Sequence, residues 1–331
     1  MQLIDNFGRT INYVRLSVTD RCDLRCVYCM AEDMTFLPRA EVLSIEELAT
    51  LGETFVGLGV TKLRITGGEP LVRRGIIDLL QRLGQLSELQ ELCLTTNGTH
   101  LPQYAQAIKD AGVDRINISL DSLNPERFRQ LTRFGDINQV LAGIKAAQAA
   151  GFKRIKLNCV ALKHYNADEV PALVQFALDE GLDISFIEEM PLGRIDEHGR
   201  AAEFVSSDEL RSAISHHHAL QPAFAKGQDN AGPARYWQAS GYDSRIGFIS
   251  PHSNNFCSSC NRVRITATGR LLLCLGQENS VDLRETLRTS NNLPTDLRTR
   301  IISAMQHKPE KHTFDLADEP QIVRFMNMTG G

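Results

Sequence analysis

The chain has 331 residues, of which 42% are hydrophobic and 23% are charged, and its formal net charge is −4. This composition is typical of a folded globular protein with one large domain or two ordinary ones. A net negative charge argues against a general nucleic-acid binder, because such a protein needs a basic surface to neutralise phosphates. No basic segment leads into an apolar run at the N-terminus, and no run of about 18 uncharged apolar residues occurs, so we expect neither an export signal nor a membrane span.

Short β-branched segments alternate with longer amphipathic segments over the first two thirds of the chain. This pattern predicts repeated βα units around a parallel sheet. We expect strands at residues 13–18, 62–66, 91–95, 115–120, 154–161 and 183–188. We expect helices at residues 74–83, 103–111, 138–150 and 168–180, and another that begins at Ser44, where Glu47 completes a capping box. The predicted fold class is α/β, an incomplete (β/α)6 TIM-type barrel.

The alternation weakens after about residue 191, where Gly, His and Asp become common. We therefore expect residues 1–190 to form the partial-barrel core and residues 191–331 to form a C-terminal region that covers the barrel mouth. Ligands of such folds bind beyond the carboxyl ends of the strands. The polar or glycine-rich positions expected there include Gly67, Gly68, Glu69, Thr95, Ser119 and Met190.

Three cysteines, Cys22, Cys26 and Cys29, follow the first predicted strand with the spacing C-x3-C-x2-C. A tetrahedral structural zinc needs four ligands, whereas three cysteines on a four-iron cluster leave one iron open to another ligand. Two other interpretations remain: a zinc site completed by a distant His or Cys, and buried thiols that bind nothing.

A second group, Cys257, Cys260 and Cys274, has the spacing C-x2-C-x13-C. It also supplies three ligands rather than four, so either another residue such as His252 completes a zinc site or a second cluster has an open iron. The two remaining cysteines, Cys93 and Cys159, lie in apolar strand segments and are expected to be small core residues.

Arg15 and Lys156 interrupt otherwise apolar strand segments. A charged side chain inside a parallel barrel is costly unless it faces a ligand or an ionic partner. These two residues are therefore candidate ligand contacts, and a salt bridge at a strand end is the alternative.

The first cysteine motif, with an aromatic residue before its third cysteine, resembles the radical S-adenosylmethionine (SAM) superfamily. The resemblance implies a [4Fe-4S] cluster whose open iron binds SAM. Cleavage of SAM then gives a 5'-deoxyadenosyl radical, which removes a hydrogen atom from the substrate. The resemblance assigns SAM binding to Tyr28, Gly67, Gly68, Glu69, Ser119 and Met190.

The segment Asn261-Arg262-Val263-Arg264 and the terminal Gly330-Gly331 narrow this resemblance to the GTP 3',8-cyclase family over essentially the whole chain. The family implies a lyase-type reaction, the first step of molybdenum cofactor synthesis, in which the ribose 3' carbon of GTP joins C8 of guanine to give 3',8-cyclo-7,8-dihydro-GTP. It also implies a second [4Fe-4S] cluster, whose open iron binds guanine. The implied GTP contacts are Arg15, Arg64, Thr95, Lys156, Arg262, Val263 and Arg264, and the implied catalytic set is Cys22, Cys26, Cys29, Arg262, Arg264, Gly330 and Gly331.

The same resemblance implies a low-potential electron donor of the flavodoxin or ferredoxin type and a following enzyme, cyclic pyranopterin monophosphate synthase. It allows a homodimer, with no nucleic acid or membrane partner. Clusters that need reducing surroundings indicate the cytoplasm. Two alternatives stay open: another radical SAM enzyme with an auxiliary cluster, such as a peptide-modifying maturase, and a zinc-stabilised binding protein without catalysis.

Overall fold

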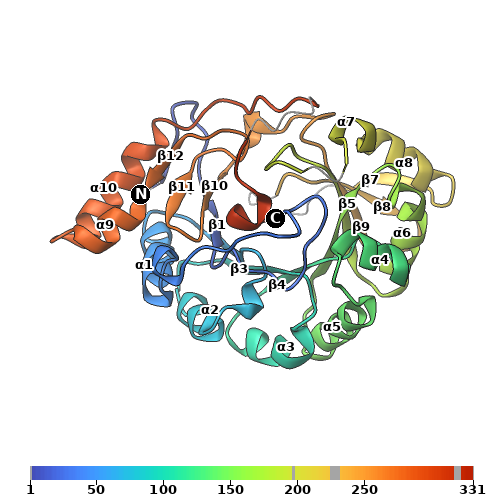
Figure 1. Cartoon of the computed structure of the whole chain (residues 1–331), viewed down its shortest axis with the longest axis horizontal. Helices are drawn as coiled ribbons and strands as arrows, with labels where there is room; N and C mark the ends of the chain where they lie inside the picture. The colour runs from blue at the N-terminus through green and yellow to red at the C-terminus, as the bar shows by residue number, and fades with distance from the viewer. Residues whose placement is uncertain (1, 196–197, 224–231, 317–321, 331) are drawn as a thin grey trace.

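The computed structural model describes residues 2–195, 198–223, 232–316 and 322–330. Within these residues the chain forms one 12-stranded sheet in the order β12-β11-β10-β1-β2-β3-β4-β5-β6-β9-β8-β7. The sheet curves into an open ring with helices around its outside (Figure 1). The predicted α/β partial barrel is therefore confirmed.

The six predicted strands pair in parallel in sequence order. They are β1 (Tyr13–Ser17), β2 (Lys62–Thr66), β3 (Glu91–Thr96), β4 (Arg115–Ser119), β5 (Ile155–Ala161) and β6 (Asp183–Glu188). The helices between them are α1 (Ile45–Val56), α2 (Ile76–Gly84), α3 (Leu101–Asp110), α4 (Pro125–Thr132), α5 (Ile137–Ala149) and α6 (Val170–Asp179). The capping box expected at Ser44 is present, because the Ser44 hydroxyl accepts from the Glu47 backbone and the Glu47 carboxylate accepts from the Ser44 backbone. Helix α4 was not predicted.

The C-terminal region adds strands to both edges of this parallel sheet. Its strands are β7 (Leu220–Ala223), β8 (Arg235–Ala239), β9 (Arg245–Ile249), β10 (Arg262–Ile265), β11 (Arg270–Leu272) and β12 (Ser280–Asp282). Strand β9 pairs in parallel with β6, and β10 pairs in parallel with β1. The sheet thus continues across residue 190, and the predicted domain boundary there stays a prediction.

The remaining helices are short or peripheral. They are α7 (Arg200–Glu203), α8 (Ser207–Ser215), α9 (Leu283–Thr289), α10 (Leu293–Met305) and α11 (Met326–Thr329), with single 3-10 turns at Arg39–Glu41, Pro70–Val72, Ala167–Glu169 and Cys257–Ser259. None of the helices in the described part of the chain is both long and apolar enough to cross a membrane.

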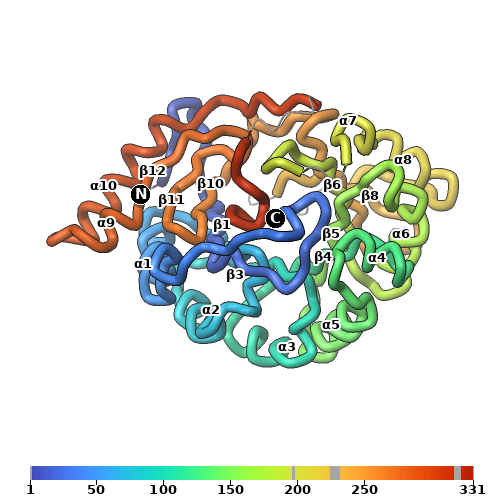
Figure 2. The backbone as a smooth tube through the Cα atoms, in the orientation of Figure 1, coloured from blue at the N-terminus to red at the C-terminus, as the bar shows by residue number. Residues whose placement is uncertain are grey.

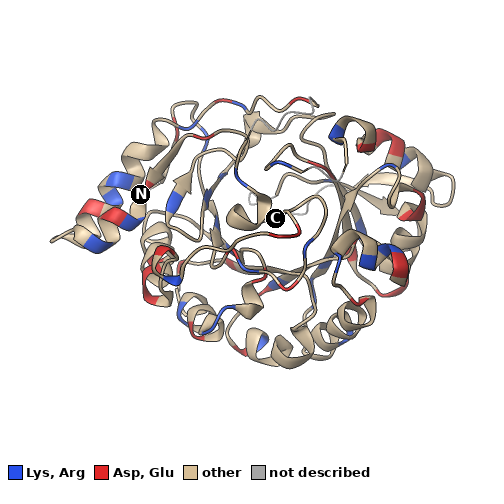
Figure 3. Cartoon of the chain, viewed as in Figure 1, with Lys and Arg blue, Asp and Glu red and all other residues tan. Residues whose placement is uncertain are grey.

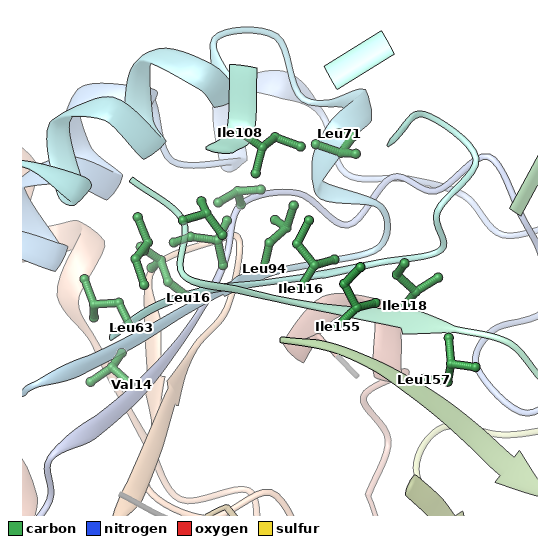
Figure 4. Close-up of a cluster of buried hydrophobic side chains, with 14 of the residues drawn as sticks. Val14, Leu16, Leu63, Leu71, Leu94, Ile108, Ile116, Ile118, Ile155 and Leu157 are labelled. Carbon is green, nitrogen blue, oxygen red and sulfur yellow. The ribbon is translucent and has the colours of Figure 1, made fainter. Parts of the chain in front are cut away.

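The main hydrophobic core lies between the sheet and its outer helices. Val14 and Leu16 of β1 and Leu63 of β2 point to this side, where they pack with residues of the neighbouring strands and helices (Figure 4). Successive residues of a strand face opposite sides of the sheet. Arg15, between Val14 and Leu16, and Arg64, next to Leu63, therefore face the interior of the ring. The pattern that builds the core therefore also places the charged strand residues inside.

The last helix, α11, lies inside the ring. Figure 2 shows the C-terminal end of the tube beside the N-terminal segment that follows β1. The Asn327 side-chain amide donates to the Asp20 carbonyl at 2.8 Å, and the Met326 backbone N–H donates to the Cys29 carbonyl at 3.3 Å. The C-terminal tail is therefore attached to the loop that carries the first cysteine group.

Candidate active site

The three cysteines of the first group line one small cavity at the carboxyl end of β1. Gly67 and Gly68 line the same cavity, as do Thr95, Ser119 and Tyr28. A Cβ atom on Gly68 would lie 2.3 Å from the Arg21 carbonyl oxygen, so this glycine is needed for the close packing of the two loops. Gly67 and Gly68 were expected to expose their backbone to a ligand. In this structure they also let the turn after β2 pack against the cysteine loop.

Glu69 does not line either of the two cavities at the strand ends. Its buried carboxylate accepts from the Leu71 and Asn97 backbone N–H groups at 2.9 and 2.7 Å and from the Thr96 hydroxyl at 2.8 Å. Burial raises the pKa of Glu69 to about 8, although these three donors act in the opposite direction. In this structure Glu69 braces the turn after β2.

The thiols of the first group lie in surroundings that disfavour a free thiolate. Burial raises the pKa of Cys22, Cys26 and Cys29, and the nearby carboxylates of Asp23, Glu69 and Asp121 raise it further. A bound metal centre reverses this effect, because coordination deprotonates a thiol outright. Three soft sulfur donors in one cavity are the donor set that suits an iron-sulfur cluster.

The cysteines of the second group line a larger cavity that adjoins the first. Cys257, Cys260 and Cys274 occupy one side of it, and Tyr28, Ser119 and Met326 line both cavities. The larger cavity also contains most of the predicted GTP contacts: Arg15, Arg64, Lys156, Arg262, Val263 and Arg264, together with Met190. Residues from both ends of the chain thus surround one space.

Three arginines stand at paired positions on three adjacent strands. Arg15 on β1 pairs with Arg264 on β10 and with Arg64 on β2, and all three line the larger cavity. Figure 3 shows basic residues on strands inside the ring as well as on the outer helices. Like charges at directly paired positions destabilise a sheet. This row of arginines therefore favours an anionic ligand in the cavity.

The electrostatics of two of these arginines, Arg15 and Arg264, point the same way, whereas Tyr13 and Cys93 outweigh burial and raise the pKa of Arg64. Burial, with contributions from Arg64 and Arg262, lowers the pKa of Arg15 to about 10. Burial, with Arg15 nearby, also lowers the pKa of Arg264 well below its ordinary value. A bound anion would favour the charged form of both guanidinium groups and raise these pKa values.

Two tyrosine hydroxyls contact the cations of the cavity. The Arg64 Nε donates to the Tyr13 hydroxyl at 2.7 Å, and the Lys156 ammonium lies 3.5 Å from the Tyr236 hydroxyl. Burial raises the pKa of Tyr13, but Arg64, Arg15 and Lys62 outweigh it and lower that pKa to about 7. Residues two apart on a strand face the same side. Tyr13 therefore shares the inner face of β1 with Arg15, and Lys62 shares the inner face of β2 with Arg64. The alternation of the strand residues could have identified both as site residues.

The cavity also contains acceptor atoms that no described residue satisfies. The side-chain oxygens of Asn117 and Asn158 are buried without a hydrogen-bond partner in the described part of the chain, and both residues line the larger cavity. Buried polar atoms normally find a partner. These oxygens are therefore suited to receive hydrogen bonds from a ligand with N–H or O–H groups.

The other predicted site residues lie in different surroundings. Thr95 lies in the smaller cavity, and its hydroxyl accepts from Arg64 at 3.1 Å. Val263 borders the larger cavity, but it is 1% exposed and belongs to the hydrophobic core. Gly330 is buried, and its carbonyl accepts from Arg264 at 2.5 Å. Gly331 lies outside the described residues.

His252 does not lie with the second cysteine group. Its Nε2 is 2.9 Å from the Glu189 carbonyl oxygen, and its backbone N–H donates to the Glu188 carboxylate. Within the described residues, no three His, Cys, Asp or Glu side chains are placed to hold a single metal ion. A four-iron cluster has a different requirement, because each of its cysteines binds a different iron.

Comparison with known protein families defines the class of this chain. The model described as "Radical SAM superfamily" matches residues 16–177, and the model described as "Molybdenum Cofactor Synthesis C" matches residues 182–314. Crystal structures of SuiB from Streptococcus suis share the fold: the form bound to S-adenosylmethionine aligns with a TM-score of 0.63 at 14% identity, over 97% of this chain and 78% of that one. The fold is thus that of a radical SAM protein with a C-terminal extension.

Full-length relatives identify the family within this superfamily. The GTP 3',8-cyclase of Saccharophagus degradans is 60% identical over 329 residues, which cover 99% of this chain and 98% of that protein. The GTP 3',8-cyclase of Pseudomonas entomophila is 59% identical over 330 residues, with the same coverage. The chain belongs to the GTP 3',8-cyclase family.

Proposed function

We propose that this chain is a lyase-type, SAM-dependent GTP 3',8-cyclase that converts GTP to 3',8-cyclo-7,8-dihydro-GTP. The observation that carries the proposal is the row Arg264–Arg15–Arg64, which faces a cavity that adjoins the pocket of the first cysteine group. A buried cation costs several kcal/mol unless an anion compensates it. A triphosphate would bring negative charge to the cavity that this row faces.

The first cysteine group would hold a [4Fe-4S] cluster through Cys22, Cys26 and Cys29. The cluster, with SAM bound at its open iron, would supply the 5'-deoxyadenosyl radical. The turn at Gly67 and Gly68 and the side chains of Ser119 and Met190 would orient SAM at the carboxyl ends of the strands. The Tyr28 hydroxyl donates to Asp121 at 2.7 Å, which fixes the Tyr28 ring between the two cavities.

The second cysteine group would hold a second [4Fe-4S] cluster through Cys257, Cys260 and Cys274. All three line the larger cavity on the side where Arg262 and Arg264 also lie. Guanine would lie toward this group, and the triphosphate toward Arg15, Arg64 and Lys156. The two unsatisfied asparagine oxygens, on Asn117 and Asn158, would accept hydrogen bonds from the nucleoside.

The C-terminal tail would position Arg264 for the substrate. The Gly330 carbonyl accepts from Arg264, and a Cβ atom on Gly330 would lie 2.2 Å from Cγ2 of Thr66. Gly330 also has a positive φ of 73°, which L residues with a side chain adopt at a cost. A side chain at this position would therefore displace the tail from Arg264.

The wider setting is part of the same proposal. A low-potential donor of the flavodoxin or ferredoxin type would reduce the first cluster in the cytoplasm, and cyclic pyranopterin monophosphate synthase would act on the product. A homodimer is compatible with this arrangement.

The test is anaerobic reconstitution with iron and sulfide, followed by incubation with dithionite, SAM and GTP. We expect about eight irons per chain for two [4Fe-4S] clusters, together with 5'-deoxyadenosine and a cyclised product from GTP. A Cys22→Ala variant should lose 5'-deoxyadenosine formation altogether. If GTP is returned intact while 5'-deoxyadenosine forms, the substrate assignment is wrong; if zinc fills both sites, the enzyme assignment is wrong.

A further inference from the structure

Lys308 is a buried lysine next to the second cysteine group. It follows helix α10 and is 3% exposed. Its ammonium donates to the Leu273 carbonyl at 2.6 Å and lies 3.7 Å from the sulfur of Cys260. Leu273 directly precedes Cys274, so this one ammonium contacts the segments of two of the three cysteines.

These contacts do not include a carboxylate. Within the described residues, the two contacts of the Lys308 ammonium are a carbonyl oxygen and a thiol. A buried ammonium is strongly destabilising unless a negative charge compensates it. The sulfur of Cys260, once deprotonated by a metal centre, is the anion that the geometry provides.

The surroundings of the two cysteine groups differ. The carboxyl groups of Asp23 and Asp121 act on the first group, whose Cys22 carbonyl also accepts from Arg25 at 2.7 Å. The second group is next to cations: Lys308 at Cys260, and Arg9, which donates to the Cys257 carbonyl at 2.8 Å. Arg9 is itself paired with Asp5 at 2.6 Å, so Lys308 is the cation of the two that contacts a sulfur.

We propose that Lys308 is a positioning residue of the second iron-sulfur cluster, which holds Cys260 and the Cys274 segment in place and raises the reduction potential of that cluster. The inference rests on the second cluster of the proposed function. Reduction adds negative charge to a cluster, and a fixed cation beside a ligand sulfur favours the reduced form.

The test compares the wild-type holoenzyme with Lys308→Gln and Lys308→Arg in anaerobic redox titrations followed by electron paramagnetic resonance. The component that disappears when Cys257, Cys260 and Cys274 are changed to Ser is assigned to the second cluster. In Lys308→Gln, which keeps a donor for the Leu273 carbonyl but has no charge, we expect the equilibrium constant for reducing this component to fall about tenfold, equivalent to about 59 mV for a one-electron couple. The first-cluster component should not move.

Two variants separate charge from structure. Lys308→Arg retains the charge and should keep the potential close to that of the wild type. Lys311→Gln removes an exposed lysine three residues further along and should leave both potentials unchanged. Iron analysis of each protein shows whether both clusters are present.

The outcomes are distinguishable. The role of Lys308 is wrong if Lys308→Gln has about eight irons and the wild-type potential, or if the Gln and Arg variants lose the second cluster equally, since then only shape matters. A wild-type chain with about four irons would instead contradict the second cluster of the proposed function, and with it this inference.

Discussion

At the scale of single residues, the basic side chains that line the larger cavity contact tyrosine hydroxyls as well as carboxylates. Arg64 donates to Tyr13, and Lys156 lies beside Tyr236, whereas Lys62 pairs with Glu91 at 2.5 Å. A phenol in its protonated form accepts a hydrogen bond without cancelling the charge of its partner. This arrangement keeps the positive charge of the cavity available to a ligand.

Tyr13 therefore predicts a pH dependence of GTP binding. Its pKa of about 7 in the free protein lies below the ordinary value, so a bound triphosphate, which adds negative charge, should raise the pKa and cause proton uptake. Proton-linked binding weakens as pH rises above the free-state pKa. We expect the affinity of the wild type to fall about fivefold between pH 7 and pH 8 relative to Tyr13→Phe.

Calorimetric titration of both proteins with GTP measures this difference. Ionisation of the γ-phosphate is common to both proteins and cancels in the comparison. Tyr104→Phe, on the outer helix α3, is the matched control and should follow the wild type. Parallel pH profiles for wild type and Tyr13→Phe would show that Tyr13 does not titrate with binding.

The residues that sequence reasoning found and missed differ in the kind of signal they give. Arg15 and Lys156 stand out because they interrupt apolar strands, and both line the cavity. Tyr13 gives no clear signal, because a tyrosine in a strand fits a hydrophobic core as well as it fits a binding site. Lys308 gives no local signal at all, because its contact with Cys260 joins residues 48 positions apart.

At the scale of elements, the cysteine loop depends on the segments packed against it. The turn after β2 approaches it so closely that Gly68 has no room for a Cβ atom. We expect Gly68→Ala to separate the two loops and to prevent the first cluster from assembling. The measured iron content should fall from about eight to about four per chain.

Gly57→Ala is the control for this substitution. Gly57 ends helix α1 with an ordinary φ of −63°, and the nearest contact of its added Cβ atom would be 3.4 Å. This variant should retain the iron content of the wild type. Unchanged iron content in Gly68→Ala would show that the two loops can separate without loss of the cluster.

The tail helix α11 gives a second prediction for the same loop. Asn327 is 1% exposed and donates to the Asp20 carbonyl, so Asn327→Ala removes a buried hydrogen bond worth about 1 kcal/mol and leaves that carbonyl unsatisfied. We expect faster iron loss from the first group to a chelator. Val323→Ala, at a residue 78% exposed on the same segment, should behave as the wild type; equal rates in all three proteins would contradict a bracing role for the tail.

The elements were predictable where they repeat and unpredictable where they pair at long range. Strands β1 to β5 are each followed by a helix of the outer layer, and the positions of all six predicted strands are confirmed to within one or two residues. Strands β9 and β10 have no such repeat. They join β6 and β1 through backbone pairing between segments distant in sequence, which no local pattern encodes.

At the scale of the whole molecule, the ends of the chain meet at one site. Strand β10 brings Arg262 and Arg264 beside Arg15 of β1, and helix α11 brings Met326 to the wall between the two cavities. The formal net charge is −4, yet the interior row of arginines is positive. The interior of the ring therefore has a local positive potential that favours an anion, although the net charge of the chain is negative.

The central claim is that a hydrogen atom passes directly from GTP in the larger cavity to the SAM-derived radical at the boundary between the cavities, where Tyr28, Ser119 and Met326 line both. The most direct test is incubation of the reconstituted, reduced protein with SAM and GTP deuterated at the ribose 3' position, followed by mass spectrometry of the 5'-deoxyadenosine. The account predicts 5'-deoxyadenosine that carries one deuterium, formed together with the cyclised nucleotide. Unlabelled 5'-deoxyadenosine, formed while the GTP keeps its deuterium, would contradict it.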